Sequence, residues 1–267
     1  MKIILSRKGF DTVNGGCPSP YMPDSDGTLL SLPIPIPPSD GKRTYSELTY
    51  KGLPYDQLLK QLNPKENYHN CHLDPDIRAD IWLKAPANWQ PAFGQTGGAQ
   101  GHLRKQDVGA GDLFLFFGWF RQVRQTVDGS FRFVSGAPNL HVIYGYLQVD
   151  SVLTHPEDVK KYDWHPHADI NMCNNKNNAL YLPQKTLSFD KSKPGCGVLG
   201  FSENRVLTLK NRPMGTWKEV PALLPSNLVS TRKNSANGSG VYYKGVWQEM
   251  VLRETDESEV WAKSVLR

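Results

Sequence analysis

Two cations and a carboxylate follow the first apolar run of the chain, in the segment SRKGFD. A turn at the end of a strand presents backbone N–H groups and side-chain cations to an anion. Asp11 could serve there as a general base or as a hydrogen-bond acceptor, or it could simply cap its own turn. We predict catalytic roles for Lys8 and Asp11, and base or phosphate contacts for Ser6, Arg7 and Phe10.

A second group of titratable side chains lies in HNCHLDPDIR, where His69, Cys71, His72, Asp74 and Asp76 fall within eight residues. Such a density of ligand-type groups can bind a metal ion or supply acid–base chemistry. An Asp-Pro-Asp sequence is also an ordinary turn. No other cluster has the spacing to complete a zinc site, so we predict catalytic carboxylates at Asp74 and Asp76, with no metal and no cofactor.

The segment FGQTGGAQGHL is rich in glycine but matches neither a dinucleotide-binding fingerprint nor a P-loop, which disfavours nucleoside triphosphate binding. We expect a loop that allows close approach of a phosphate or sugar at Gly97 and Gly98. Gln95 could read a base edge, as glutamine does with adenine. His102 is a candidate catalytic partner. The alternative interpretation is a flexible connecting loop.

Two further groups are candidates for ligand contact. His165 and His167 flank a proline near Asp169, which favours a loop that could bind a metal or a phosphate or cap the site, and no third metal ligand is assignable. Trp119 and Arg121 lie at the end of a long apolar run, where an aromatic face could stack on an unstacked base. We predict base or phosphate contacts for these four residues and expect the remaining tryptophans to be core residues.

The elements that must position these groups indicate an α+β fold. Residues 2–5 and 247–251 read as strands, and residues 257–266 as a terminal helix. The proline-rich run at 29–38 must be extended, as an edge strand or a wall-lining loop. Residues 45–62 have helical spacing, with Ser46 or Pro54 as the start. Residues 108–152 contain two apolar runs and an Asp128-Gly129 turn, the pattern of antiparallel strands in a small barrel.

We therefore predict a single domain over residues 1–267, built around a mixed, partly barrel-like β-sheet with peripheral helices and long Pro/Gly-rich loops. The net charge of +5 is compatible with a phosphate-bearing partner. The four cysteines are scattered, without a CxxC pair. The chain lacks an apolar run long enough to span a membrane, and its apolar start is too short for a signal peptide, so we expect a cytoplasmic protein.

Taken in order, SRKGFD, PSP with DGTLLSLPIP, HLDPDI, GQ-x-GG-x-x-x-HL and GDLFLFFGWFR resemble the nucleotide modification associated domain family, type three. The resemblance covers roughly the first 150 residues, and WHPH extends it. It implies a place in prokaryotic or phage-linked systems that make, read or attack modified DNA bases. The block from Gly111 to Val149 also resembles PUA-like barrels of the ASCH and EVE branches, which implies a fold that holds an unusual base in a pocket.

Three functions are compatible with these features. The first is a DNA glycosylase of a phage-defence type that flips out and excises a hypermodified, for example glucosylated, pyrimidine; it needs a carboxylate and a group that assists the leaving base. The second is a non-catalytic reader, with phosphate contacts from Arg7, Lys8, Arg121 and Arg124. The third is an enzyme that acts on free nucleotides. We favour the glycosylase because the polar motifs are numerous, and we expect DNA carrying modified bases as the partner, with no membrane and no inferable protein partner.

Overall fold

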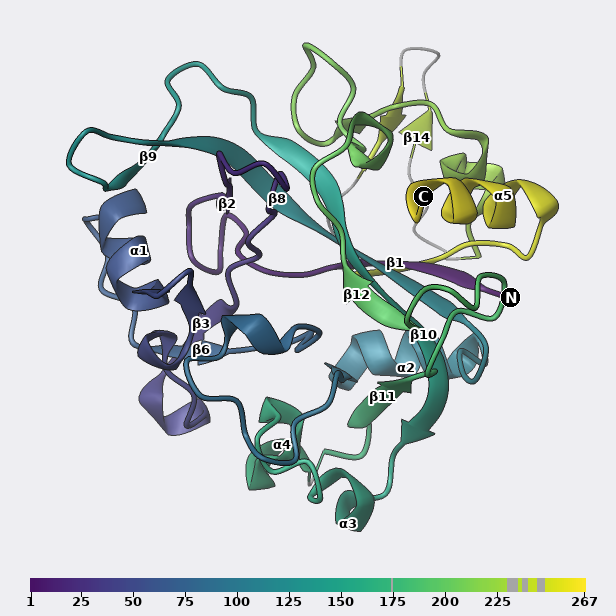
Figure 1. Cartoon of the computed structure of the whole chain (residues 1–267). Coiled ribbons are helices and arrows are strands. Elements are labelled where there is room, and N and C mark those ends of the chain that lie inside the picture. The colour runs from purple at the N-terminus through teal and green to yellow at the C-terminus, as the bar shows by residue number, and fades with distance from the viewer. Residues whose placement is uncertain (174, 230–234, 237–239, 244–247) are drawn as a thin grey trace.

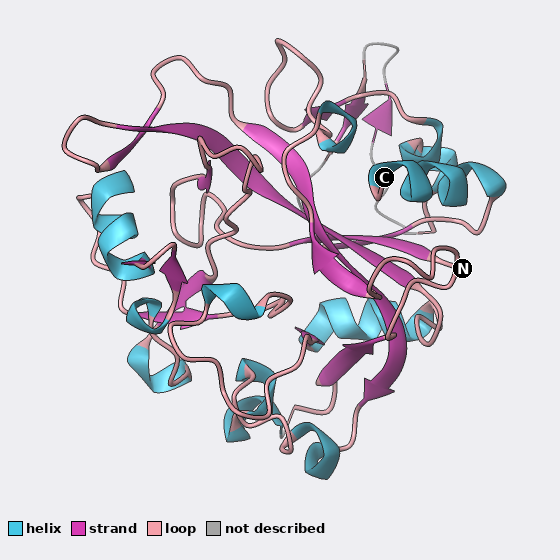
Figure 2. Cartoon of the chain, viewed as in Figure 1, coloured by secondary structure: helices cyan, strands magenta, loops and turns pink. Residues whose placement is uncertain are grey.

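Two long strands, β8 (Leu113–Gln125) and β10 (Leu140–Leu153), run antiparallel through the middle of the molecule (Figure 1). This structure, a computed structural model, describes residues 1–173, 175–229, 235–236, 240–243 and 248–267. Figure 2 shows that long loops connect most of the remaining elements. The other elements of the chain are arranged around these two strands (Figure 1).

The main sheet has the order β16-β1-β8-β10-β11-β7, and β2, β9 and β12 pair with it at the sides. It is mixed because β1 and β2 run parallel to β8 whereas the other pairs are antiparallel. Its further strands are β1 (Ile3–Arg7), β2 (Ser19–Tyr21), β7 (Phe93–Gln95), β9 (Phe131–Phe133), β11 (Ala179–Pro183), β12 (Cys196–Val198) and β16 (Glu249–Val251).

The sheet curls until its two end strands approach each other. Gln95 lies on β7 and Glu249 lies on β16, at opposite ends of the strand order, yet the Gln95 amide donates a hydrogen bond to the Glu249 carboxyl group. A sheet bent in this way is a half-barrel. The predicted α+β fold with a mixed, partly barrel-like sheet is therefore confirmed.

Both faces of β8 are buried, which explains its continuous apolar run. Alternate side chains enter different cores because successive residues of a strand point to opposite faces. Leu115 and Phe117 pack with Trp217 and the C-terminal helix on one face. Phe114 and Phe116 pack on the other face with residues of the second core, among them Phe93, Leu103 and Tyr181.

The α-helices are short and lie around the sheet (Figure 1). They are α1 (Tyr55–Leu62), α2 (Gly97–Lys105), α3 (Pro156–Val159), α4 (Ile170–Cys173) and α5 (Asp256–Val265). The predicted terminal helix is thus present as α5, with Thr255 as its N-cap. Within the described part of the chain, none of the helices has the length and hydropathy to cross a membrane.

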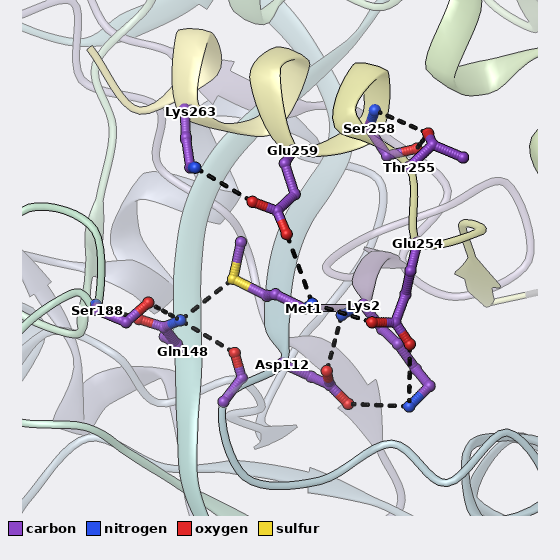
Figure 3. A network of polar contacts seen from close by, with 11 residues as sticks. Met1, Lys2, Asp112, Gln148, Ser188, Glu254, Thr255, Ser258, Glu259 and Lys263 are labelled. Atoms are coloured by element: carbon purple, nitrogen blue, oxygen red, sulfur yellow. Dashed lines mark hydrogen bonds and ion pairs between the residues drawn. The ribbon is translucent and has the colours of Figure 1, made fainter.

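Helix α5 is tied to the start of β1 by charge (Figure 3). The amino group of Met1 lies 3.0 Å from a Glu254 oxygen and 3.5 Å from a Glu259 oxygen. The Lys2 backbone N–H donates to Asp112 at 2.8 Å. These contacts fix the start of β1, which lies between β16 and β8 and leads directly to Lys8.

The predicted helix over residues 45–62 is only partly correct. Residues Tyr45–Glu47 form a 3₁₀ turn, and Thr49–Tyr50 pairs with Leu53–Pro54 as the small hairpin β4–β5. The turn of this hairpin has a positive φ at Lys51 and Gly52, which a helix does not allow. The helix begins after Pro54, which was one of the two predicted starts.

The prediction of a glycine-rich loop at residues 93–103 is wrong. Residues Phe93–Gln95 form strand β7, and residues 97–105 form helix α2. Glycine disfavours helix, but Gln100 and Leu103 bury one side of α2, and tertiary packing outweighs local propensity here.

The other predicted strands are present, but they begin and end at residues that differ from the predicted ones. The proline-rich run contains β3 (Ile34–Ile36), which pairs with β6 (Asn70–His72) in a separate two-stranded sheet. Asp128-Gly129 forms the expected turn, but it joins β8 to the short β9, and β10 begins later. Of the predicted strand at 247–251, β16 covers the last three residues, and Trp247 lies outside the described residues. Three short strands, β13 (Thr216–Trp217), β14 (Ser235–Ala236) and β15 (Val241–Tyr242), form a further small sheet.

Candidate functional site

A cavity of about 270 Å³ lies where the chain leaves β1. Ligand pockets in proteins have volumes of roughly 300–1,000 Å³, so this one suits a single base-sized group. Ile34 and Ile36 of β3 contribute apolar wall, which confirms the wall-lining role of the proline-rich run. The polar lining comes from segments far apart in sequence, and its titratable members are Arg7, Lys8, Asp11, His72, Asp74 and His167.

Lys8 lies between two buried carboxyl groups, those of Glu249 and Asp74. Its Nζ is 3.4 Å from Glu249 Oε1 and 3.7 Å from Asp74 Oδ2, and it lies 4.4 Å from the centre of the Phe93 ring. All three charged side chains are at most 9% exposed. Burying one cation with two carboxyl groups is costly unless they stay paired, so removal of a single member leaves an uncompensated buried charge.

Glu249, on the end strand β16, is the third member of this charged group. Its Oε1 accepts from Ser6 Oγ at 2.9 Å and from the Gln95 amide. Its Oε2 is buried and lacks a hydrogen-bond partner among the described residues. Burial raises the pKa of Glu249, against the opposing effect of the Lys8 charge. The carboxyl group therefore holds its proton to a higher pH than an exposed glutamate does.

Asp74 behaves in the opposite way. Burial alone would raise its pKa, but the Lys8 charge and the close contact with His165 outweigh burial and hold the pKa well below its usual range. Its Oδ1 accepts from the Gly94 backbone N–H at 2.6 Å and lies 3.4 Å from His165 Nε2. Asp74 is thus an ionised carboxylate held in one orientation at the cavity wall.

The rings of His72 and His167 meet edge to face beside Asp74, with ring centroids 5.2 Å apart. One ligand-type atom from each of these three residues lies within 4.8 Å of the others. Burial lowers the pKa of His72 to about 4 and that of His167 to about 3, although the Asp74 charge opposes the shift. Both imidazoles are therefore neutral near pH 7 and can act as acceptors or ligands.

Gly94 makes this arrangement possible in two ways. Its N–H fixes Asp74, and its missing side chain leaves room for the His167 ring. A Cβ at position 94 would lie 2.2 Å from His167 Cδ2, a distance that real Cβ atoms do not show. The glycine of β7 is thus required by packing against the site and not by an unusual φ.

Several residues predicted from the sequence meet at the cavity. The residues Arg7, Lys8, Asp11, Asp74, Gln95 and His167 line it. His165 contacts the lining residue Asp74, whereas Ser6 contacts Glu249, which does not line the cavity but pairs with Lys8. Asp11 lies at the rim, where its Oδ1 accepts from the backbone N–H groups of Val13 and Asn14. That geometry matches the alternative we gave for Asp11, a carboxylate that caps its own turn.

Gln95 is placed at the cavity but not as a reader of bases. Its amide nitrogen donates to Glu249, and its amide oxygen accepts from the Thr96 backbone N–H at 2.9 Å. Both ends that a bidentate contact with adenine would need already hold a protein partner, which leaves one donor and one acceptor position at most. Thr96 lines the same cavity, and its hydroxyl group is buried without a hydrogen-bond partner among the described residues.

Asp76 and Phe10 lie away from the cavity. Asp76 accepts from Trp89 Nε1 at 2.9 Å and from Trp82 Nε1 at 3.2 Å, and burial raises its pKa to about 6. Phe10 is 1% exposed and packs on the rings of Tyr45 and Tyr68. The predicted catalytic role of Asp76 and the predicted base contact of Phe10 therefore do not fit these positions, since neither side chain reaches the cavity.

The remaining predicted residues also lie outside the cavity lining. Gly97 and Gly98 belong to the first turn of α2, and His102 lies further along it. Trp119 donates to Asn139 at 2.9 Å, and Arg121 donates to the Val134 carbonyl at 3.1 Å. Both side chains are occupied near the far end of β8, so they do not form a lip over this cavity.

Sequence reasoning did not assign site roles to His72, Gly94, Thr96, Asn178 or Glu249. The only sequence signal for Glu249 was an acid directly before the apolar run MVL, and the structure pairs it with Ser6 of β1. His72 precedes Asp74 by two residues, the spacing that places both on one side of an extended chain. Asn178 shares a hydrogen bond of 2.7 Å with His167 Nδ1, and that contact had no sequence signal.

Comparison with known proteins agrees with the motif order found in the sequence. The family model described as nucleotide modification associated domain 3 matches residues 2–259, well beyond the first 150 residues of the resemblance. No curated protein matches the chain, and no solved structure matches it either. The likeness to PUA-like barrels therefore stays a prediction. With a family model that covers nearly its whole length, the chain belongs to the nucleotide modification associated domain 3 family.

Proposed function

We propose that the chain is a DNA glycosylase-type hydrolase that excises a modified base, for example a glucosylated pyrimidine, after the nucleotide has been flipped out of the duplex. The observation that carries the proposal is the meeting of Asp74, Lys8 and Thr96 at one base-sized cavity. A family linked to nucleotide modification supports the choice of a nucleic acid as substrate.

Hydrolysis of an N-glycosidic bond has two requirements. Water must attack C1′ of the sugar while positive charge develops there, and the departing base must be assisted as it takes the electron pair of the C1′–N bond. Asp74 meets the first requirement because it is ionised and held rigidly by Gly94 and Lys8. It positions the attacking water at the cavity wall.

The second requirement falls to Lys8 and Thr96. The Lys8 ammonium offers three N–H donors, of which the contacts with Asp74 and Glu249 use two at most. Thr96 lines the cavity, and rotation of its side chain would turn the buried, unpaired hydroxyl toward the edge of the base. Arg7 at the rim is suited to the phosphate of the flipped nucleotide.

The test is incubation of the protein with phage DNA that carries glucosylated pyrimidines and with unmodified DNA of the same length. Released base is measured by mass spectrometry, and abasic sites by strand cleavage under alkali. We expect both products from modified DNA alone, and their loss in an Asp74→Asn variant.

Two outcomes would point elsewhere. Tight binding of modified DNA without released base would indicate the non-catalytic reader. Action on modified mononucleotides with no effect on the polymer would indicate the free-nucleotide enzyme. A folded Asp74→Asn variant that still releases base at the wild-type rate would remove Asp74 from the mechanism.

A further inference from the structure

We propose that His72, Asp74 and His167 bind a divalent transition-metal ion at the wall of the cavity, with zinc as the best-fitting metal. The three side chains come from β6, from the turn that follows it and from the 3₁₀ turn Pro166–Ala168. From the sequence we predicted no metal, because no other cluster had the spacing to complete a zinc site with HNCHLDPDIR and no third ligand was assignable to His165 and His167. The fold supplies a complete set of three ligands by bringing the two clusters together.

The donor set is suited to such an ion. Two imidazoles and one carboxylate form the three-ligand arrangement that leaves open positions for water or substrate in catalytic zinc sites. Ligand atoms around tetrahedral zinc lie roughly 3.4 Å apart, given bonds of about 2.1 Å. The present separations of up to 4.8 Å require the side chains to move inward by about an ångström.

A second set of contacts orients the ligands, as is usual around metal ions. Asn178 Nδ2 donates to the His167 carbonyl, so its Oδ1 accepts from His167 Nδ1 and makes Nε2 the acceptor nitrogen. His165 and the Gly94 N–H hold Asp74 Oδ1. Gly94 also leaves the space that the His167 ring occupies.

Lys8 acts as the counter-charge of Asp74, at 3.7 Å from its Oδ2. A divalent cation at the same carboxylate would be repelled by the ammonium group. Replacing Lys8 by a neutral side chain should therefore strengthen metal binding. A structural ion pair that is unrelated to metal would show no such effect.

The role of the ion, but not its binding, rests on the proposed function. A bound cation lowers the pKa of its water toward neutrality and so generates hydroxide for the attack on C1′. Asp74 would then position the water through the ion. The binding measurement below uses no DNA, so it stands apart from any assay of base release.

The experiment uses the full chain, stripped with a chelator and passed through gel filtration. Cobalt(II) chloride is titrated as a spectroscopic probe, because its visible absorption reports nitrogen and oxygen ligation, and zinc chloride is then added as a competitor. We expect one equivalent of cobalt per chain, displaced by zinc. Absence of a cobalt spectrum together with absence of zinc binding by calorimetry would overturn the proposal.

Variants assign the ligands. His72→Gln and His167→Gln should each weaken cobalt binding at least about 100-fold, and Asn178→Ala about 10-fold or more. Gly94→Ala should weaken it as well, because the added Cβ displaces the His167 ring. Lys8→Met should strengthen it.

His69→Ala is the matched control, since this exposed histidine belongs to the same segment but not to the group of three. Circular dichroism and thermal melting verify that each variant is folded. Equal cobalt affinity in His69→Ala and in folded His72→Gln and His167→Gln would place the metal elsewhere and refute the assignment.

The two proposals fail in different ways. Metal binding at this site without base release would remove the glycosylase and leave the metal site. Base release by chelator-treated protein that binds neither cobalt nor zinc would leave the glycosylase and remove the metal site.

Discussion

Two groups of side chains contain histidines shielded from solvent, and they differ in what surrounds these histidines. The cavity group consists of His72 and His167 beside Asp74 and Lys8. The core group consists of His141 with Phe117, Trp217 and Tyr243. Burial lowers the pKa of His141 to about 3, as it does for His167.

The difference is in the partners and not in the burial. Trp217 Nε1 donates to His141 Nδ1 at 2.9 Å, and aromatic rings surround the imidazole, so it completes a packed core. His72 and His167 converge with a carboxylate on a cavity. A shifted pKa alone therefore does not distinguish the two groups, whereas convergence on a cavity does. Variants of the core group should affect stability, and variants of the cavity group should affect chemistry.

The largest effect is expected from Trp217→Ala. Trp217 is fully buried and stacks on Tyr243 with ring centroids 4.6 Å apart. Truncation creates a cavity and leaves the buried His141 Nδ1 without its donor, so the free energy of unfolding should fall by about 5 kcal/mol. Chemical denaturation measures it. Base release per folded molecule should stay at the wild-type level, and its loss in folded protein would contradict the separation of the two groups.

Asp74→Asn should have the next largest effect, and on chemistry. Loss of the carboxylate that positions the attacking water should slow base release about 10³-fold, equivalent to about 4 kcal/mol on the barrier. Single-turnover kinetics on modified DNA measures this. Asparagine keeps the shape of the side chain, so a rate within a few-fold of wild type, with the fold intact, would exclude Asp74 as the reacting carboxylate.

Acid should destabilise the core group through His141. Its pKa of about 3 in the folded chain lies below the ordinary value of 6.5, so the unfolded chain binds the proton first as pH falls. The stability is complete above pH 6.5 and is lost below it at about 1.4 kcal/mol per pH unit, or roughly 2 kcal/mol by pH 5. Denaturation at pH 7 and pH 5 measures it. His141→Gln should remove this part of the slope, and an identical slope in the variant would show that other groups cause it.

Asp76→Asn should have the smallest effect. Asp76 accepts hydrogen bonds from two tryptophans outside the cavity, and an amide oxygen can still accept them. We expect a loss of about 1 kcal/mol in the free energy of unfolding and base release within about threefold of wild type. The substitution removes a carboxylate only two residues from Asp74, so it is the matched control for Asp74→Asn. A rate as low as that of Asp74→Asn would return Asp76 to the mechanism.

Much of the scaffold could be predicted because its signals are local. The apolar run of β8, the turn at Asp128-Gly129 and the terminal helix follow from periodicity and turn chemistry. Helix α2 was missed because its glycines argue against helix, and only burial of Gln100 and Leu103 against the sheet stabilises it. Local propensity is weak compared with tertiary packing.

The candidate site, too, could be predicted only in part from the sequence. The types and order of residues in SRKGFD, HLDPDI and WHPH were enough to single out Lys8, Asp74 and His167, and to identify the family. The sequence could not separate Asp74 from Asp76, because both carboxylates stand in the same turn. Their surroundings decide the outcome: Lys8 and Gly94 hold one at the cavity, and two tryptophans bind the other.

By itself, then, the sequence determined the class of fold, the family and the segments rich in reactive groups, since composition and periodicity are properties of neighbouring residues. Only the tertiary structure decided which of these groups meet. The curl of the sheet brings Gln95 of β7 to Glu249 of β16. Because Gly94 has no side chain, the His167 ring has room to lie beside Asp74. Contacts of this kind depend on residues far apart in the chain, so their geometry emerges only when the sheet closes.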